Sequence, residues 1–239
     1  MEKNNIRKKD LTDFPFEDVP NKNWALSLLV AIGGFFYISF GIWTLPKILV
    51  NEYFISFLFL FFCLVALSIL DNKFFNKIFK KINSKDLLII IFTLVICYGM
   101  GFISSLGKTD LVENPITGII NKSNIVKILI VTAIQLIGEE ILFVIPFLYV
   151  YNKMKIKKSK RISIIVAWII SSLFFGALHL PTYSFNFYQA FIVIGTVRMG
   201  MSISYILTKN LTVSYIAHVL YDFLILIGVY LVGEYMMFL

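Results

Sequence analysis

Long apolar stretches separated by short polar connections dominate this sequence. About 20 consecutive apolar residues are enough for an α-helix to cross the hydrocarbon core of a bilayer. Seven stretches approach this length: Trp24–Leu45, Tyr53–Leu70, Leu87–Leu106, Ile128–Val150, Ile162–Leu180, Phe187–Leu207 and Leu211–Val232. The pattern predicts an all-α fold, a polytopic membrane helix bundle of about seven transmembrane helices.

The polar residues divide the chain into few parts. We predict a cytoplasmic N-terminal tail over residues 1–23 and a single membrane domain over residues 24–239, since no internal repeat and no second polar domain are visible. The first three apolar stretches contain no charged residue, whereas each later stretch contains a titratable one. We therefore expect the first three helices to be peripheral and the functional site to lie among the last four.

Composition and charge agree with a membrane protein. Apolar residues make up 59% of the chain and charged residues 15%, against roughly 45–50% and about 25% in ordinary soluble domains. The net charge of +8 is unevenly distributed, because the tail, residues 71–86 and residues 152–161 hold most Lys and Arg. Basic connections normally stay in the cytoplasm, which predicts a cytoplasmic N-terminus and a C-terminus outside. Lipids are the expected partners of these basic residues, and we expect no nucleic-acid partner. The abundance of Ile, Lys, Asn and Phe suggests the plasma membrane of a bacterium.

Charged side chains inside the later stretches mark a candidate site. Glu139 and Glu140 are adjacent in the fourth stretch, and a carboxylate at such depth costs roughly 2.5 kcal/mol or more. Both histidines, an arginine and an aspartate also lie in or beside apolar stretches: His179, His218, Arg198 and Asp222. Each has a structural interpretation, because a membrane histidine is more often a bond between helices and an arginine can simply neutralise a glutamate. Their occurrence together in one small bundle favours a functional site.

Helical spacing groups these side chains into pairs. Residues four apart share one face of a helix, which pairs Gln135 with Glu139, Phe175 with His179 and His218 with Asp222. A polar face inside a membrane must meet other polar groups or a water-filled cavity. We therefore predict that Glu139, Glu140, His179, His218 and Asp222 surround one cavity, with Gln135 and Phe175 at its edge.

Three of these groups resemble the motifs of a known family. The strings Gly138-Glu139-Glu140, Phe175-Gly-Ala-Leu-His179 and His218-Val-Leu-Tyr-Asp222 resemble, in order, the Glu-Glu-x-x-x-Arg, Phe-x-x-x-His and His-x-x-x-Asn/Asp motifs of the CPBP intramembrane proteases. This family contains CAAX-processing and bacteriocin-processing, or Abi-type, enzymes. The resemblance covers residues 124–227 and implies an intramembrane glutamate-type endopeptidase that cleaves membrane-associated peptides or proteins.

The resemblance also implies roles for the site residues. Glu139 takes the position of the base that activates water, assisted by His179, while His218 and Asp222 take the position of the oxyanion donors. Asp222 can donate a hydrogen bond only when it is protonated. A zinc site built from Glu139, His179 and His218 is the alternative, although no HExxH motif is present; the glutamate-type reading needs no cofactor.

One position departs from the family pattern. The motif arginine would fall at position 144, where this chain has Val144. Arg198 from another helix is a candidate replacement partner for Glu140; otherwise Glu140 is protonated, or the site no longer cleaves. The sequence therefore leaves two further functions open besides proteolysis: a non-cleaving immunity protein or scaffold for a membrane protein partner, and a small transporter with a proton relay.

A difficulty of depth remains in the predicted boundaries. His179 falls near the outer end of its helix, whereas His218 falls about two turns from the cytoplasmic end of its own. The two rings then differ in height by roughly 10–15 Å. They can meet only if the turn at Lys209 and Asn210 is sunk into the protein or the helices tilt strongly.

Overall fold

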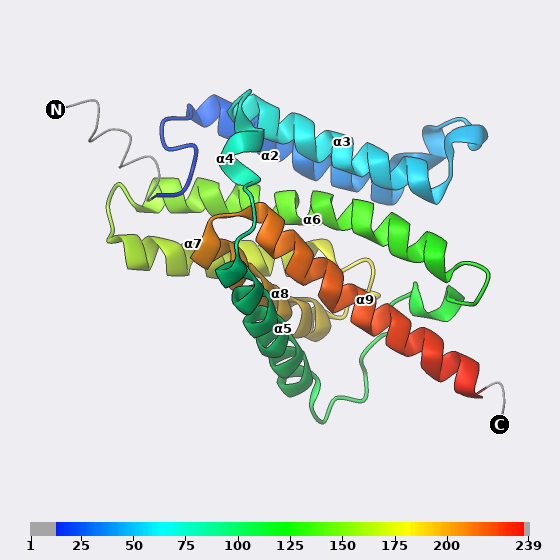
Figure 1. Ribbon diagram of the computed structural model, residues 1–239. Helices are drawn as coiled ribbons and strands as arrows, with labels where there is room; N and C mark the ends of the chain where they lie inside the picture. The colour runs from blue at the N-terminus through cyan, green and yellow to red at the C-terminus, as the bar shows by residue number, and fades with distance from the viewer. Residues whose placement is uncertain (1–12, 237–239) are drawn as a thin grey trace.

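The computed structural model describes residues 13–236, and within this range the chain is helical with no strand. The helices are α2 (Asn21–Phe36), α3 (Glu52–Leu70), α4 (Phe74–Ile78), α5 (Ser84–Ser105), α6 (Ile125–Met154), α7 (Lys160–Leu178), α8 (Gly195–Thr208) and α9 (Leu211–Met236). A π-helix, Tyr37–Gly41, and a 3-10 turn, Ile42–Thr44, extend α2, and a second π-helix, Tyr188–Ile194, leads into α8 (Figure 1).

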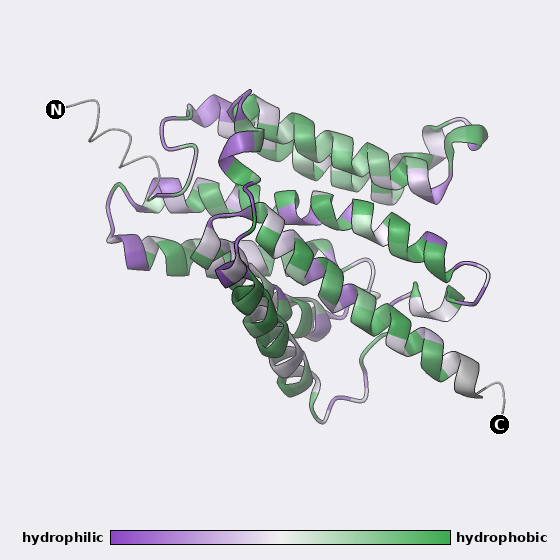
Figure 2. Cartoon of the chain, viewed as in Figure 1, coloured by the Kyte–Doolittle hydropathy of each residue, from purple (hydrophilic) through white to green (hydrophobic). Residues whose placement is uncertain are grey.

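The predicted membrane spans are confirmed. Among the described residues, seven helical stretches are long and apolar enough to cross a membrane. Their ends agree with the sequence prediction to within about one helical turn. Large apolar side chains point outward along the bundle, as Leu29 (69% exposed), Leu88 (69%) and Ile103 (73%) illustrate. Figure 2 shows this apolar surface along most of the helices, with polar residues gathered in the connections and at helix ends. The chain is an integral membrane protein.

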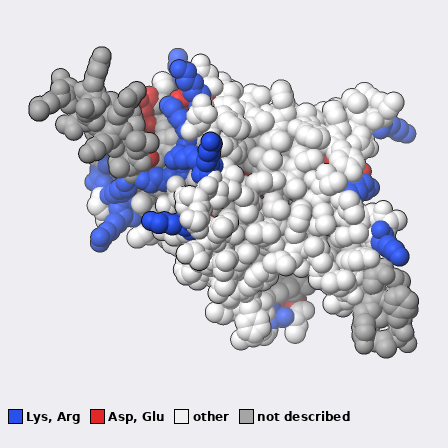
Figure 3. All heavy atoms as spheres, viewed as in Figure 1, with Lys and Arg blue, Asp and Glu red and all other residues white. Residues whose placement is uncertain are grey.

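Basic side chains gather at one end of the bundle. This end contains the start of α2, the connection from α3 through α4 to α5, and the connection between α6 and α7 (Figure 3). Residues 71–86 and 152–161 therefore lie at the same end, as the charge pattern predicts. We call it the basic end, and the connections 106–124 and 179–187 lie at the opposite end (Figure 1).

Helix α6 forms the centre of the bundle and packs against α3, α7 and α9. Residues 141–148, toward the basic end, are all buried, and an aromatic column along one face contains Phe143, Phe147 and Tyr151, each 0% exposed. Phe143 stacks on Phe147, and Phe147 stacks on Tyr151. The side chains are four residues apart, which places them one above another on the same helix face.

The residues before the first span belong to the bundle. Helix α2 begins at Asn21, three residues before the predicted start, and Phe14 is 2% exposed. The Phe14 ring lies 4.8 Å from that of Tyr151, and the Asn152 side chain donates a hydrogen bond to the Phe16 carbonyl at 3.0 Å. Residues 13–20 of the predicted tail are thus packed against the end of α6. Residues 1–12 of that tail lie outside the described range.

The predicted difficulty of depth is resolved at the turn between α8 and α9. Asn210 is 3% exposed, its side-chain oxygen accepts a hydrogen bond from the Lys80 N–H at 2.9 Å, and its nitrogen donates to the Lys80 carbonyl at 3.1 Å. The turn is buried beneath the α4–α5 connection, so α9 starts inside the bundle rather than at the basic surface. His218 therefore lies nearer the middle of the bundle than a turn at the basic surface would place it.

The division into three peripheral and four functional helices is wrong for α5. This helix packs against both α8 and α9. Its residue Cys97 is completely buried against the backbone carbonyl of Val197, and Gly101 lies on the cavity described below. The uncharged sequence of α5 gave no sign of this position, because a helix can line a site through small residues without supplying a polar group.

Candidate active site

A cavity of about 630 Å³ lies between α5, α6, α7, α8 and α9. Most predicted site residues line it: Gln135, Glu139, Phe175, His179, Arg198, His218 and Asp222. Two loops at the end opposite the basic end complete the wall with Asn114, Pro115, Ile116, Thr117, Thr182 and Tyr183. The predicted convergence of Glu139, His179, His218 and Asp222 on one cavity is therefore present.

Glu139 lies on the cavity and accepts a hydrogen bond from its helical neighbour. The Gln135 Nε2 atom donates to Glu139 Oε1 at 2.8 Å, as the four-residue spacing predicts. The pair sits in the half of α6 farther from the basic end, near the loops that complete the cavity. The carboxylate is thus oriented by a neutral donor, and no described residue forms an ion pair with it.

His179 caps the C-terminal end of helix α7, and a hydrogen bond and an aromatic contact orient its ring. Its Nδ1 atom lies 2.9 Å from the Phe175 carbonyl oxygen, which can only accept, so Nδ1 carries the proton. In the neutral ring this leaves Nε2 with a free lone pair. The Phe175 and His179 rings lie 4.6 Å apart between centroids, so the motif residue Phe175 supports the imidazole. His179 is therefore arranged to accept a proton or a hydrogen bond from a molecule in the cavity.

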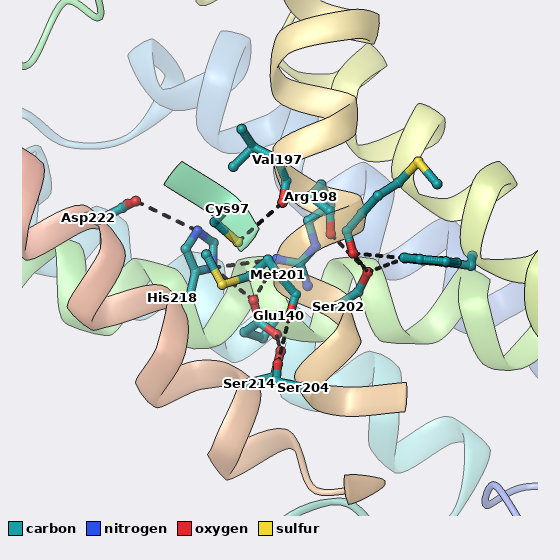
Figure 4. A network of polar contacts seen from close by, with 12 residues as sticks. Cys97, Glu140, Val197, Arg198, Met201, Ser202, Ser204, Ser214, His218 and Asp222 are labelled. Carbon is teal, nitrogen blue, oxygen red and sulfur yellow. Dashed lines mark hydrogen bonds and ion pairs between the residues drawn. The ribbon is translucent and has the colours of Figure 1, made fainter. Parts of the chain in front are cut away.

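Glu140 does not line the cavity, which corrects that part of the prediction. Its side chain is completely buried, one layer behind the wall, and is held by three polar groups (Figure 4). Arg198 Nη1 lies 2.5 Å and His218 Nδ1 lies 2.8 Å from Glu140 Oε1, while the Ser214 hydroxyl donates to Oε2 at 2.5 Å. Adjacent residues on a helix point about 100° apart, so Glu139 faces the cavity while Glu140 faces the packed core.

Arg198 supplies the positive charge that is missing at Val144, the position of the motif arginine. The side chain of Arg198 is 1% exposed, and its guanidinium lies over two aromatic rings, 4.2 Å from the Phe143 centroid and 4.8 Å from that of Phe175. Val144, on α6 one turn from Glu140, is completely buried in the apolar core. The contact predicted between Arg198 and Glu140 is thus present, and the arginine of this ion pair comes from α8 instead of α6.

His218 connects the buried ion pair to the cavity. Because the Glu140 carboxylate accepts from its partners, Nδ1 of His218 carries a proton, and Nε2 is directed to the other side. On that side Asp222 Oδ1 lies 4.0 Å from Nε2. His218 can donate from Nε2 only when both nitrogens are protonated, and its charge then lies 2.8 Å from the Glu140 carboxylate.

Sequence reasoning missed several polar residues at the site, among them Ser214, Tyr183 and Asn114. Ser214 lies four residues before His218 on α9, so the same spacing rule that paired His218 with Asp222 would have found it. Tyr183 and Asn114 come from loops, where no periodicity indicates direction. The Asn114 amide donates to the Tyr183 hydroxyl at 3.5 Å. Burial raises the pKa of the Tyr183 hydroxyl, so it stays protonated and remains a donor at the cavity.

The alternative metal site gains no support from the arrangement. Within residues 13–236 no group of three or more His, Cys, Asp or Glu side chains is placed to hold a metal ion. Glu139, His179 and His218 line the same cavity without forming such a group.

Fold and site together define an intramembrane helix bundle with a polar cavity and a buried glutamate–arginine pair. A family model described as type II CAAX prenyl endopeptidase Rce1-like matches residues 121–224. The predicted resemblance to the CPBP/CAAX protease family is confirmed on this segment, which contains all three motifs and Arg198. At the family level this supports a CAAX-type intramembrane endopeptidase. No curated protein and no solved structure matches the chain.

Proposed function

We propose that this protein is an intramembrane endopeptidase that hydrolyses a peptide bond with Glu139 as general base. The observation that carries the proposal is the shared cavity, which brings Glu139, His179, His218 and Asp222 together from α6, α7 and α9. Peptide hydrolysis requires a base for water and donors for the oxyanion, and this cavity offers both kinds of group.

The two adjacent glutamates suit different roles because their surroundings differ. Glu140 is fully buried and accepts from Arg198, His218 and Ser214, so it has no free oxygen for a water molecule. Glu139 is on the cavity, and within residues 13–236 its hydrogen-bond donor is the neutral Gln135. We assign Glu139 as the base and Glu140 as the residue that holds Arg198 and His218 in place.

The reaction then proceeds by ordinary acid–base steps. Glu139 removes a proton from a water molecule that also bonds to Nε2 of His179, and the water oxygen attacks the carbonyl carbon. The negative charge that develops on the carbonyl oxygen is bound by doubly protonated His218 and by protonated Asp222. Glu139 returns its proton to the leaving nitrogen as the carbon–nitrogen bond breaks, so base and acid are the same group.

The direction of access follows from the loops around the cavity. The loop residues of the wall come from connections 106–124 and 179–187, at the end opposite the basic end. On the other side, Phe143, Phe147 and Tyr151 fill about 16 Å of helix between Glu140 and the basic surface. We infer that substrates enter from the side away from the basic connections, which the positive-inside rule makes the non-cytoplasmic side.

Glu139→Gln tests the proposal directly. The amide keeps the volume and removes the base, and we expect peptide cleavage to fall roughly 10²–10⁴-fold while membrane levels stay normal. Purified protein is incubated with an unmodified membrane peptide and with a prenylated C-terminal peptide, and products are identified by mass spectrometry. Glu52→Gln is the control, since Glu52 is an exposed partner of Lys127 at the same end of the bundle. Equal activity of Glu139→Gln and wild type would contradict the assignment of Glu139 as the base. In a separate test, wild-type activity should survive a chelator.

A further inference from the structure

The connection between α5 and α6 forms a part of the cavity wall that does not belong to an α-helix. Residues Asn114, Pro115 and Ile116 line the cavity, followed by Thr117 at the start of a 3-10 turn. The residues before them, 108–113, run without regular secondary structure. Such a segment depends on side-chain contacts for its position, because it has no helical backbone bonds of its own.

One buried side chain holds this segment by two hydrogen bonds. Gln189, 6% exposed in the π-helix before α8, accepts from the Val112 N–H at 2.7 Å and donates to the Val112 carbonyl at 2.8 Å. The carboxamide thus pairs with both backbone groups of one residue, as a neighbouring strand would. Val112 is two residues before Asn114, so the clamp fixes the chain where it reaches the cavity.

Neighbouring side chains on the same turn hold the segment at further points. Asn186 donates to the Asp110 carbonyl at 2.9 Å and accepts from the Gln189 N–H at 3.0 Å. The Tyr188 hydroxyl donates to the Ser104 carbonyl at 2.8 Å, in the last turn of α5 just before the segment. These contacts come from one turn of chain, and a π-helical segment such as the one that starts there is frequently found at functional sites.

We propose that Gln189 is a positioning residue that sets the cavity wall Asn114–Thr117 and thereby determines which substrates fit. The inference rests on the proposed function of the cavity. Glu139 and His218 are carried by α6 and α9, and His179 by the C-terminal end of α7, all outside the connection itself. If this part of the wall loses its hydrogen bonds, substrate binding and selection therefore change. The rate of the chemical step stays the same.

Gln189→Met is the test variant, because it keeps the length of the side chain and removes both bonds. Asn152→Leu is the matched control: Asn152 is also a buried amide, and it donates to the carbonyls of Pro15 and Phe16 at the basic end. Two readouts are used, the split between KM and kcat for a cleaved peptide, and the maleimide labelling rate of a cysteine at position 116. The two natural cysteines, Cys63 and Cys97, are both completely buried.

For Gln189→Met we expect KM and the labelling rate of Ile116→Cys to rise about tenfold, since two hydrogen bonds are lost, with kcat unchanged. Gln189→Glu keeps the acceptor for the Val112 N–H and should give an intermediate KM. Asn152→Leu should change neither readout. An unchanged labelling rate, an effect confined to kcat, or equal effects of Gln189→Met and Asn152→Leu would overturn the proposal.

The two readouts separate this proposal from the proposed function. If wild-type protein cleaves no probe peptide while labelling rises tenfold only in Gln189→Met, the wall assignment stands and the protease assignment fails. If wild-type protein cleaves peptides and labelling is the same in both proteins, the protease assignment stands and the role of Gln189 is wrong.

Discussion

Replacing Arg198 by leucine should be severely destabilising, because the change leaves a buried charge without its main partner. The guanidinium and the Glu140 carboxylate are 1% and 0% exposed, and their closest atoms are 2.5 Å apart. Removing one member of a buried ion pair costs roughly 3–5 kcal/mol. His218 and Ser214 still bond to Glu140 in the variant, so we expect the lower end, about 3 kcal/mol. The lost contacts with Phe143 and Phe175 add to this value.

Unfolding by sodium dodecyl sulfate in mixed micelles measures the effect, with Arg161→Leu as the control, since Arg161 is exposed at the start of α7. The double variant Arg198→Leu/Glu140→Gln removes both charges, and we expect it to be more stable than the sum of the single losses predicts, by about 2 kcal/mol. Val144→Arg should restore part of the stability of Arg198→Leu, because residue 144 lies one turn from Glu140. Additive losses below about 1 kcal/mol for each single variant would refute the reasoning.

Three further outcomes follow from the structure. Asp222→Asn should keep or raise peptide cleavage, because an amide donates at every pH; loss of cleavage with normal protein levels would show that Asp222 acts as an anion. A cysteine at position 157 should be labelled only from the cytoplasmic side of intact cells and one at position 182 only from outside, and the reverse result would invert the topology. Burial raises the pKa of Asp13, but the Tyr151 hydroxyl, the Phe14 N–H, Lys155 and Lys160 outweigh it and lower the pKa from 3.8 to about 2. The resulting stability is present above pH 3.8 and is lost as the pH falls through 2. Because the carboxylate is partly exposed, we expect about 1 kcal/mol, and Asp13→Asn should remove this pH dependence in acid unfolding curves.

The sequence by itself determined the features that depend on the residues of a single helix. Seven apolar stretches set the number of spans, because the thickness of the hydrocarbon core fixes the length of a spanning helix. The four-residue spacings of Gln135 with Glu139 and Phe175 with His179 correctly placed side chains that touch. Charges inside apolar stretches located the site, because their burial is costly unless other polar groups or water surround them.

Only the tertiary structure decided what depends on contacts between helices and loops. Helical periodicity says which residues share a face, but the tilt and height of each helix decide which faces meet. The burial of Glu140 behind the cavity that Glu139 lines therefore appears only in the packed bundle, which also selects the pairing of Arg198 with Glu140 from the alternatives that the sequence left open. Loop residues carry no periodicity at all, so the clamp of Gln189 on Val112 had no signal in the sequence. Each of these contacts joins residues 58 or more positions apart, and the packing of the helices, not local spacing, brings them together.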